Sequence, residues 1–303
     1  MGGEASRFGR QDFEHALVGA AIEHAESGGV VLTGRLSRGA QPWLVDHMVG
    51  DAVVFPGTGF VELAIRAGDA VGCSVVEELI VQAPLVLPDR GGVAIQVVVG
   101  AQDSGSRPVS VYSRAAQPDS GWALHAQGAV TSAEVTSGDV EDLAAWPPPG
   151  ADAVDIAEAY QQLAQRGYGY GPAFRGLTAM WRRGQQVFAE IALPEEVAAQ
   201  VDGYGIHPAL LDAALHAALL GFAEPVLMLP FVWERVCLHA AGAVSARVAI
   251  RATDEQSVTV TLADSAGLPA VTVGELTLHP IADEQLRALT SPVAAPAPHH
   301  IRR

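Results

Sequence analysis

Apolar and polar residues alternate along several segments of the chain, a pattern typical of half-buried antiparallel strands. The alternation is clearest over residues 29–37, 92–100, 107–114 and 122–132 in the first half, and over 243–253, 257–264 and 268–280 in the second. An Asp-Ser-Ala-Gly turn separates the last two segments, as expected for a β-hairpin. The pattern therefore predicts antiparallel sheet in both halves.

Two segments have apolar residues at helical spacing, and each follows a turn that contains proline. The first runs from Phe60 to Gly72, after the turn at Pro56, and the second runs from Pro208 to Phe222. A shorter helix is predicted between them. Because the two halves share little sequence identity, the repeat lies in their architecture. We expect an α+β protein in which an antiparallel sheet wraps around one buried helix, twice.

Changes in composition divide the chain into four parts. Residues 138–154 are acidic and then proline-rich, which predicts an interdomain linker between a first unit at 11–137 and a second at 155–283. The short helix is predicted at the start of the second unit, over residues 155–167. Residues 284–303 are rich in proline and alanine and predict a C-terminal linker or tail, which includes two histidines, His299 and His300.

The composition excludes several classes of function. About half of the 303 residues are apolar, enough for a sizeable core. All 18 cationic side chains are arginines, which excludes a Schiff-base or P-loop lysine. The formal net charge of −16 argues against nucleic acid and against anionic membrane surfaces as partners. With no signal peptide and no apolar run of membrane-spanning length, we expect a cytoplasmic protein.

Metal and nucleophile motifs are missing from the sequence. Cys73 and Cys237 each lie in an apolar segment, which predicts two buried free thiols and neither a disulfide nor a zinc site. The chain has no His-Glu-x-x-His and no Gly-x-Ser-x-Gly. We therefore expect no metal centre and no serine-hydrolase site.

His47 stands in an apolar segment that leads into a Pro-Gly-Thr-Gly turn. Such a histidine is more often a hydrogen-bonded core residue than a base, but the turn favours a base. The first N–H groups of a helix lack partners within the helix, and Gly57 lets a ligand oxygen approach them. A carbonyl bound there would be polarised, so that His47 could remove its α-hydrogen. Asp46 and Asp51 are expected to be loop carboxylates.

Asp212 is the one acidic residue of its apolar helical segment, and His216 lies four residues later on the same face. The two can form a simple charge pair near the start of the helix. Alternatively, burial keeps Asp212 protonated as a proton donor, and His216 orients it. His207, just before Pro208, is expected to close the turn.

The loop YGYGPAFRG at residues 168–176 matches no dinucleotide-binding fingerprint, because its glycine spacing differs. It can be a turn that holds Phe174 in the core, or a loop that presents the Tyr170 hydroxyl to the acid or the substrate. Both interpretations stay open. The apolar segment LPFVW, with Leu229 and Phe231, predicts core lining or a tunnel wall.

Together these segments resemble the dehydratase domain of modular polyketide synthases. In that family a first motif reads His-x3-Gly-x4-Pro, a second Tyr-Gly-Pro-x-Phe-x-Gly and a third His-Pro-x3-Asp-x3-Gln/His, and a Leu-Pro-Phe-x-Trp segment follows. Here the four correspond to residues 47–56, 170–176, 207–216 and 229–233. Four motifs in the same order, within residues 15–279, make the resemblance specific.

The resemblance implies a double hotdog fold with a pocket between the halves, His47 as the base and Asp212 as the acid. The substrate would be a 3-hydroxyacyl thioester on the phosphopantetheine arm of an acyl carrier protein, and the products the 2-enoyl thioester and water. No metal and no cofactor of the domain's own are implied. The resemblance also implies neighbouring synthase domains in the same polypeptide and a homodimer. The expected supporting residues are His216, Tyr170, Gly57, Pro56, Pro208, Phe174, Leu229 and Phe231.

One position departs from the first motif, because Asp51 stands where the family has glycine. We expect the preceding Gly50 to supply the flexibility and Asp51 to be solvated, although a carboxylate so near the base could raise the pKa of His47. The alternatives are a double-bond isomerase, a dehydrating cyclase, an impaired dehydratase, a hotdog thioesterase and a non-catalytic domain. The presence of both His47 and Asp212 argues against the last.

Overall fold

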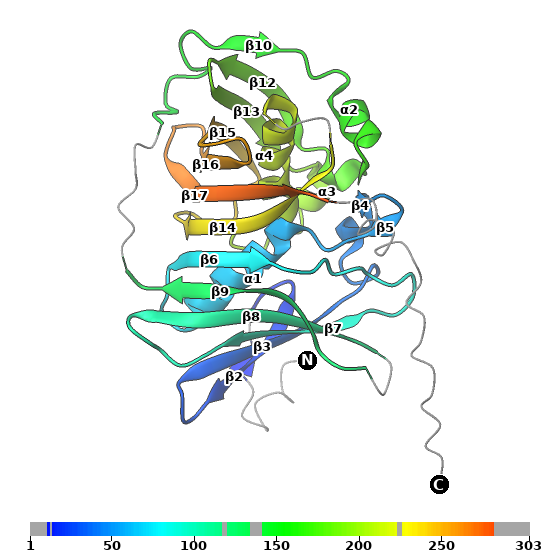
Figure 1. Cartoon of the computed structure of the whole chain (residues 1–303), viewed down its shortest axis with the longest axis vertical. Helices are drawn as coiled ribbons and strands as arrows, with labels where there is room; N and C mark the ends of the chain where they lie inside the picture. The colour runs from blue at the N-terminus through cyan, green and yellow to red at the C-terminus, as the bar shows by residue number, and fades with distance from the viewer. Residues whose placement is uncertain (1–10, 13, 117–119, 134–140, 223–225, 282–303) are drawn as a thin grey trace.

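The computed structural model describes residues 11–12, 14–116, 120–133, 141–222 and 226–281. The expected tail at 284–303, with its two histidines, lies outside these ranges. Within them, one antiparallel sheet of 14 strands runs through the whole molecule, and each half of the chain contributes seven of the strands (Figure 1). Each half curves its part of this sheet around a helix. The expectation of a sheet wrapped around one buried helix, made twice, is confirmed.

The first half places its strands around helix α1 (Gly57–Asp69). Nearly all of this helix is buried, including the predicted apolar face with Phe60, Leu63 and Ala64. In spatial order the strands are β1 (Gln11–Asp12), β2 (Val18–His24), β3 (Gly29–Leu36), β7 (Val93–Val99), β8 (Ser106–Ala115), β9 (Ala123–Thr131) and β6 (Val75–Val81).

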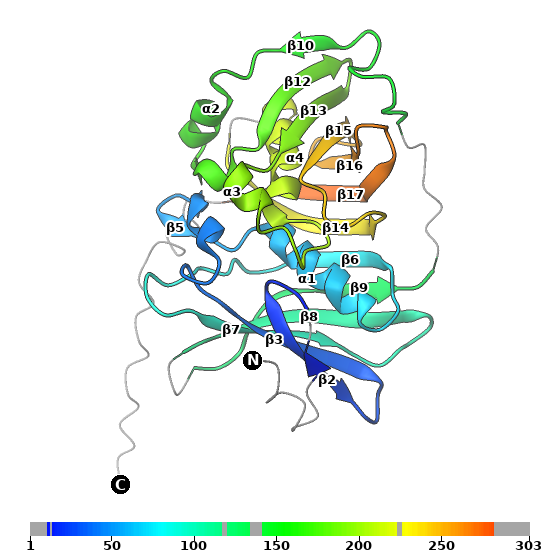
Figure 2. The ribbon, with the colours of Figure 1, turned by 180° about the vertical axis from the view of Figure 1, so that it is seen from behind.

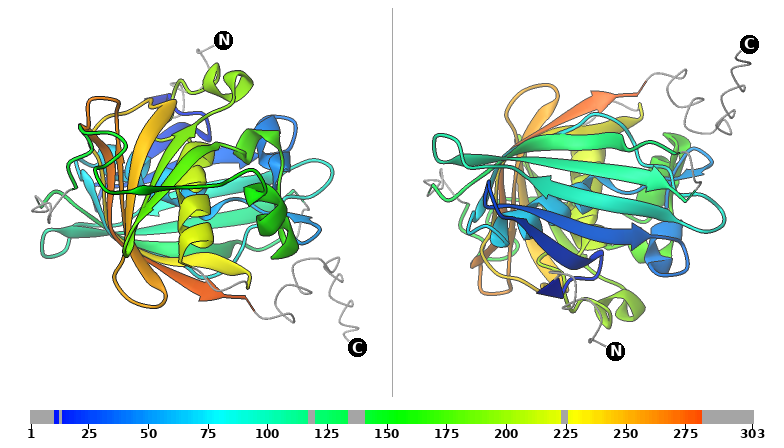
Figure 3. Two further views of the ribbon diagram at one scale, coloured as in Figure 1. Left: turned by 90° about the horizontal axis from the view of Figure 1, so that it is seen from above. Right: turned by 90° about the horizontal axis from the view of Figure 1, so that it is seen from below.

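The second half repeats the arrangement around helix α4 (Pro208–Gly221), which lies inside the curve of its strands (Figure 3). In spatial order the strands are β14 (Met228–Leu238), β17 (Pro269–Pro280), β16 (Ser257–Ala263), β15 (Ser245–Ala252), β13 (Gln186–Ala192), β12 (Leu177–Arg183) and β10 (Asp152–Val154). The predicted short helix is α2 (Ala159–Gln165), and α3 spans Glu195–Ala198. Among the described residues, no helix combines the length and the apolar character needed to cross a membrane.

The two halves join edge to edge where β6 pairs with β14. In the register of this pairing Trp233 lies opposite Leu79, and both side chains are fully buried. A strand left at a sheet edge exposes unpaired N–H and C=O groups. Pairing the two edges satisfies these groups and turns two sheets into one.

A second, smaller sheet also crosses from one half to the other. It consists of β4 (His47–Val49), β5 (Ala52–Val53) and β11 (Tyr168–Tyr170), and β11 pairs with β4. Two 3-10 turns adjoin it, η2 (Pro42–Asp46) and η3 (Pro172–Phe174). The prediction of Asp46 as a loop carboxylate is wrong. Its Oδ2 accepts a hydrogen bond from the Ala173 N–H at 2.8 Å and so ties η3 to η2.

The described part of the expected linker at 138–154 packs against the second half. Leu143 is fully buried against Phe188. The Trp146 indole donates a hydrogen bond to the Glu190 carboxylate at 2.7 Å. Farther along, β10 pairs with β12 at the edge of the sheet. These residues add a strand and a small apolar cluster to the second half.

Both cysteines are free thiols. Cys73 is buried as expected, but the prediction of a buried Cys237 is wrong, because this residue is only partly covered near the end of β14. Burial raises the pKa of both thiols.

His207 is the N-cap residue of α4. Its Nδ1 accepts a hydrogen bond from the Ala209 N–H at 3.2 Å, so it closes the turn as expected. The ring is fully buried, and this burial lowers the pKa of His207 to about 4. In the unfolded chain a histidine has a pKa of about 6.5. Between these values the unfolded chain binds a proton that the folded chain does not, so acidification from pH 6.5 towards pH 4 reduces stability.

We predict that His207→Asn makes the protein less sensitive to acid, since asparagine retains an N-cap acceptor but does not titrate. Between pH 7 and pH 5 the variant should lose about 2 kcal/mol less of its free energy of unfolding than the native protein. Urea unfolding at the two pH values measures the difference. Equal losses in both proteins would show that His207 contributes nothing to the pH dependence.

Candidate active site

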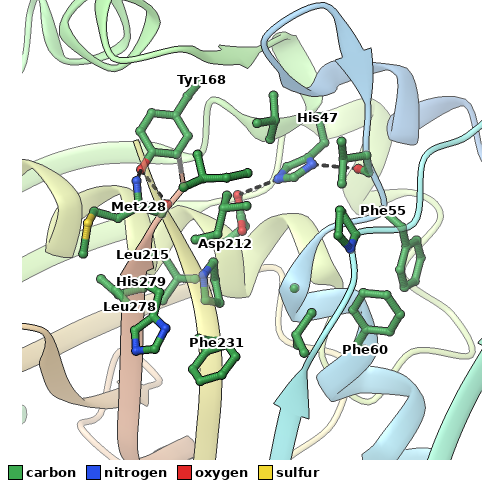
Figure 4. A pocket seen from close by; sticks show the side chains of 18 of the residues that line it. His47, Phe55, Phe60, Tyr168, Asp212, Leu215, Met228, Phe231, Leu278 and His279 are labelled. Carbon is green, nitrogen blue, oxygen red and sulfur yellow. Dashed lines mark hydrogen bonds and ion pairs between the residues drawn. The ribbon is translucent and has the colours of Figure 1, made fainter. Parts of the chain in front are cut away.

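A cavity of about 420 Å³ lies at the junction of the two halves. The first half contributes the start of α1 and the end of β6 to its wall, and the second half contributes α4, the start of β14 and the end of β17 (Figure 4). Buried residues such as Leu215 and Tyr168 line its inner part, whereas Gln82 and His279 are exposed at its mouth. The cavity is therefore a mostly apolar pocket that opens to solvent between the two halves.

His47 projects into this cavity from β4. Its Nδ1 lies 2.8 Å from the Val54 carbonyl oxygen, and since a carbonyl only accepts, Nδ1 carries the hydrogen. The unprotonated Nε2 then faces Asp212 Oδ2 at 3.8 Å (Figure 4). Burial lowers the pKa of His47, and the opposing effects of Asp212 and the Val54 carbonyl are smaller. His47 is thus a neutral imidazole with a free lone pair in the pocket.

Asp212 reaches the same cavity from α4 and is 4% exposed. The Nε2 of His216, one helical turn later, lies 3.0 Å from Asp212 Oδ2. His216 is fully buried behind the cavity wall. The expected pair therefore forms, with His216 fixing one carboxylate oxygen of Asp212.

Tyr160, on α2, extends this arrangement by one residue. Its hydroxyl accepts a hydrogen bond from the Leu177 N–H at 2.8 Å and lies 3.5 Å from His216 Nδ1. The hydroxyl can then donate to Nδ1, which leaves Nε2–H of His216 to donate to Asp212. Sequence reasoning missed Tyr160, because it lies in a short helix and belongs to none of the motif spacings.

Tyr170 lies beside His47 because β11 pairs with β4 in a register that places the two residues opposite each other. Its ring lines the cavity and is 4.0 Å from the His216 ring, centroid to centroid. Burial and then the Asp212 charge raise the pKa of Tyr170 well above its usual value, so its phenol stays protonated. Phe174 is fully buried, 4.9 Å from the His47 ring, so the interpretation of this loop as a turn that holds Phe174 in the core is confirmed. The presentation of the Tyr170 hydroxyl to the acid or the substrate stays a prediction.

The start of α1 forms the opposite wall. Gly57 lines the cavity, and Pro56 is the N-cap residue just behind it. A Cβ on Gly57 would lie 3.1 Å from the Pro230 side chain, so glycine keeps the wall close to the second half. The first N–H groups of a helix lack partners within the helix and carry its positive dipole end, which favours a carbonyl oxygen at such a place. Leu229 and Phe231 also line the cavity, whereas Pro208 lies outside the lining at the start of α4.

The turn between β4 and β5 accommodates Asp51 without strain. Gly50 takes the left-handed conformation, with a φ of 58°, and its N–H donates to the Gly167 carbonyl at 2.9 Å. Asp51 is exposed, as expected for a solvated loop residue. Elsewhere in the described ranges, no three His, Cys, Asp or Glu side chains gather as a metal site requires.

Comparisons with known proteins agree with the geometry. The family described as "Polyketide synthase dehydratase domain" matches residues 15–114, and "Polyketide synthase dehydratase N-terminal domain" matches residues 138–288. The chain is 55% identical to mycoketide-CoA synthase of Mycobacterium tuberculosis over 95% of its own length and 7% of that protein. It is 45% identical to the pikromycin polyketide synthase component PikAII of Streptomyces venezuelae, over 96% of this chain and 8% of that one. The chain spans less than a tenth of either relative.

Solved structures decide the family. The dehydratase domain of the terminal module of the rifamycin synthase superimposes with a TM-score of 0.86 at 45% identity, covering 91% of this chain and all of that one. This chain is a polyketide synthase dehydratase domain. The dehydratase domain has the double hotdog fold of its family. The activity of this family is that of a hydro-lyase. The chain is also similar to a bifunctional dehydratase-cyclase domain of ambruticin biosynthesis, with a TM-score of 0.82 at 41% identity over 89% of this chain and 99% of that one.

We predict that Asp51→Gly, which restores the family's motif, changes kcat/KM of the dehydratase domain by less than about threefold, because an exposed loop residue has little effect on the site. Steady-state dehydration kinetics measure this. A tenfold gain would mean that the Asp51 carboxylate acts on His47 after all.

Proposed function

We propose that the dehydratase domain removes water from a 3-hydroxyacyl thioester held on the phosphopantetheine arm of an acyl carrier protein. The observation that carries the proposal is the position of neutral His47 and Asp212, two buried side chains that approach to 3.8 Å in one cavity from opposite halves. A base and an acid on either side of one substrate suit the removal of a proton and a hydroxyl from adjacent carbons. The apolar walls suit an acyl chain.

The thioester carbonyl binds at the start of α1, where Gly57 lines the cavity and the first N–H groups of a helix lack partners within the helix. Hydrogen bonding there stabilises the negative charge that develops on the carbonyl oxygen. The α-hydrogen thereby becomes acidic enough for an imidazole to remove.

His47 Nε2 removes the α-hydrogen, and the electron pair of the broken C–H bond forms the α–β double bond. Asp212, as the carboxylic acid, protonates the β-hydroxyl, which leaves as water. Each proton transfer contributes on the order of a hundred- to ten-thousandfold to the rate. The proton gained by His47 then returns to Asp212, with which it makes a close pair.

Tyr170 and His216 support the acid. His216 holds Asp212 Oδ2 at 3.0 Å, which leaves the other carboxyl oxygen to face the substrate. The protonated phenol of Tyr170 lies in the cavity wall near the His47 and His216 rings and donates to the leaving hydroxyl. The proposed structural support comes from Pro56 and Pro208, which begin the helices of Gly57 and Asp212, and from Phe174, which packs beside the His47 ring.

The proposed reaction uses no cofactor of the domain's own; loss of water leaves the overall oxidation state of the acyl group unchanged, so no redox cofactor is needed. The curated relatives are large polyketide synthases that extend far beyond the matched part. We therefore propose neighbouring synthase domains in one polypeptide, an acyl carrier protein as the substrate carrier, a homodimer and a cytoplasmic setting.

A second candidate function follows from the similarity to the dehydratase-cyclase domain. After dehydration, the same base and acid could move the double bond or close an oxygen ring. Neither step changes the mass of the enoyl product. Product NMR or chromatography against standards therefore tests this alternative.

We predict that His47→Ala and Asp212→Asn each fold but lose about a hundred- to ten-thousandfold in dehydration rate. The assay follows the loss of water by mass spectrometry over a panel of 3-hydroxyacyl pantetheine thioesters of both hydroxyl configurations. His216→Ala should retain weak activity, because it removes only the support of the acid. The exposed residues His24 and Asp89 provide matched controls, and His24→Ala and Asp89→Asn should keep the native rate. Near-native turnover by Asp212→Asn would rule out Asp212 as the acid.

The pH profile is a further prediction. His47 acts as the neutral imidazole, and burial lowers its pKa below the usual 6.5. As the pH falls through 6.5, His47 therefore stays unprotonated, and kcat/KM should decline only at lower pH. Initial rates between pH 5 and pH 8 with a saturated-chain substrate measure the midpoint of this acidic limb. A midpoint above 6.5 would contradict the assignment.

A further inference from the structure

A second buried pair of a histidine and a carboxylate lies outside the cavity. Glu62, on α1, is fully buried, and its Oε1 accepts a hydrogen bond from His15 Nε2 at 2.8 Å. Neither residue lines the cavity that contains His47 and Asp212. A buried carboxylate is costly unless hydrogen bonds compensate for the lost water, so its further partners indicate its role.

Those partners belong to the other half of the molecule. The Gly205 N–H donates to Glu62 Oε1 at 2.7 Å, and the Ile206 N–H donates to Oε2 at 2.9 Å. These two residues directly precede the N-cap of α4. Hydrogen bonds to an ionised acceptor are about twice as strong as neutral ones. Glu62 thus holds the segment that leads into the helix of Asp212.

A neighbouring residue makes a parallel contact. Thr58 lies four residues before Glu62, on the same side of α1, and its Oγ1 donates a hydrogen bond to the Pro208 carbonyl at 3.0 Å. A Cβ on Gly205 would lie 3.3 Å from Glu62 Oε2 and 2.7 Å from the Leu238 side chain, so the close approach needs glycine. Together, Thr58 and Glu62 fix residues 205–208 on α1.

This contact connects the two groups that act on the substrate. Gly57, at the proposed carbonyl site, directly precedes Thr58, and Asp212 lies one helical turn after Pro208. Seen from behind, α1 and α4 meet near the middle of the molecule (Figure 2). A shift of α4 along α1 would therefore move the acid relative to the carbonyl.

We propose that Glu62 is a positioning residue for Asp212, because it fixes the start of α4 on α1 and so sets the place of the acid relative to the bound carbonyl. Glu62 touches no substrate and acts only through the helix that it holds. The proposal rests on the roles given above to Asp212 and Gly57.

The donors around Glu62 suit a carboxylate and not an amide. His15 Nδ1 accepts from the Leu17 N–H at 3.2 Å, so Nε2 carries the hydrogen and donates to Glu62. Three N–H groups thus point at the two oxygens of one side chain. A glutamine there would turn its own NH2 group against at least one of these donors.

The test is Glu62→Gln in the full chain, with a 3-hydroxyacyl pantetheine thioester as substrate. Because small misplacements of reacting groups are costly, kcat should fall by about ten- to a hundredfold, while KM stays within about threefold. Glu62→Asp retains the charged acceptor and should recover part of kcat. Thr58→Val, which loses only the bond to Pro208, should lower kcat by about threefold.

A matched control separates positioning from general destabilisation. Phe188→Leu lowers stability in the small cluster of Leu143 and Ala249, away from the contact between α1 and α4. At a temperature well below both melting points, this control should keep the native kcat while Glu62→Gln does not. Native kcat in folded Glu62→Gln would overturn the proposal. If Glu62→Gln does not fold, Thr58→Val decides alone, and an unchanged kcat in that variant overturns it.

A double variant separates this proposal from the proposed function. If Glu62 acts through Asp212, adding Glu62→Gln to Asp212→Asn lowers the residual rate no further. If Glu62→Gln lowers kcat in the Asp212→Asn background by the same factor as in the native protein, the positioning role is overturned while Asp212 remains the acid. An Asp212→Asn variant with native activity would instead contradict the proposed function itself.

Discussion

Backbone pairing between β6 and β14 is the interaction on which the site depends. The two edge strands join their sheets into one, with Trp233 and Leu79 fully buried at the junction. His47 comes from one side of this junction and Asp212 from the other. A separation of 3.8 Å between side chains from two half-molecules therefore requires that the halves be held rigidly. The pairing of β11 with β4 adds a second, local connection next to His47.

Removal from water sets the chemical state of His47 and Tyr170. Burial keeps His47 neutral and the Tyr170 phenol protonated. The hydrogen bond that His47 Nδ1 donates to the Val54 carbonyl fixes the tautomer and directs the lone pair of Nε2 into the cavity. On the other side of the cavity, a series of hydrogen bonds runs from the Leu177 N–H through Tyr160 and His216 to Asp212. Base and acid are thus each oriented by a polar partner, the Val54 carbonyl for His47 and the His216 ring for Asp212.

The parts of this arrangement that local spacing encodes were predictable from the sequence. Both long helices and the strands β3, β7, β8, β9, β15, β16 and β17 follow from apolar periodicity, and the base and acid candidates follow from their motifs. Strand β6 was not predicted, because Glu77 and Glu78 interrupt its alternation at an irregularity in the pairing with β9. The roles of Glu62 and Tyr160 depend on contacts between segments distant in the chain. No local pattern reports such contacts, and the structure was needed to find them.

The central claim is that His47 and Asp212 act together on one substrate, and a 3-alkynoyl pantetheine thioester tests it most directly. Removal of its α-hydrogen by His47, with protonation of the γ-carbon by Asp212, converts the alkyne into an allenyl thioester that is electrophilic at the β-carbon. His47 returns its proton to Asp212, and the freed lone pair of Nε2 then adds to that carbon while Asp212 protonates the α-carbon. Peptide mass spectrometry should find one adduct, on His47, and none in Asp212→Asn. An adduct on another residue, or native labelling in Asp212→Asn, would contradict the account.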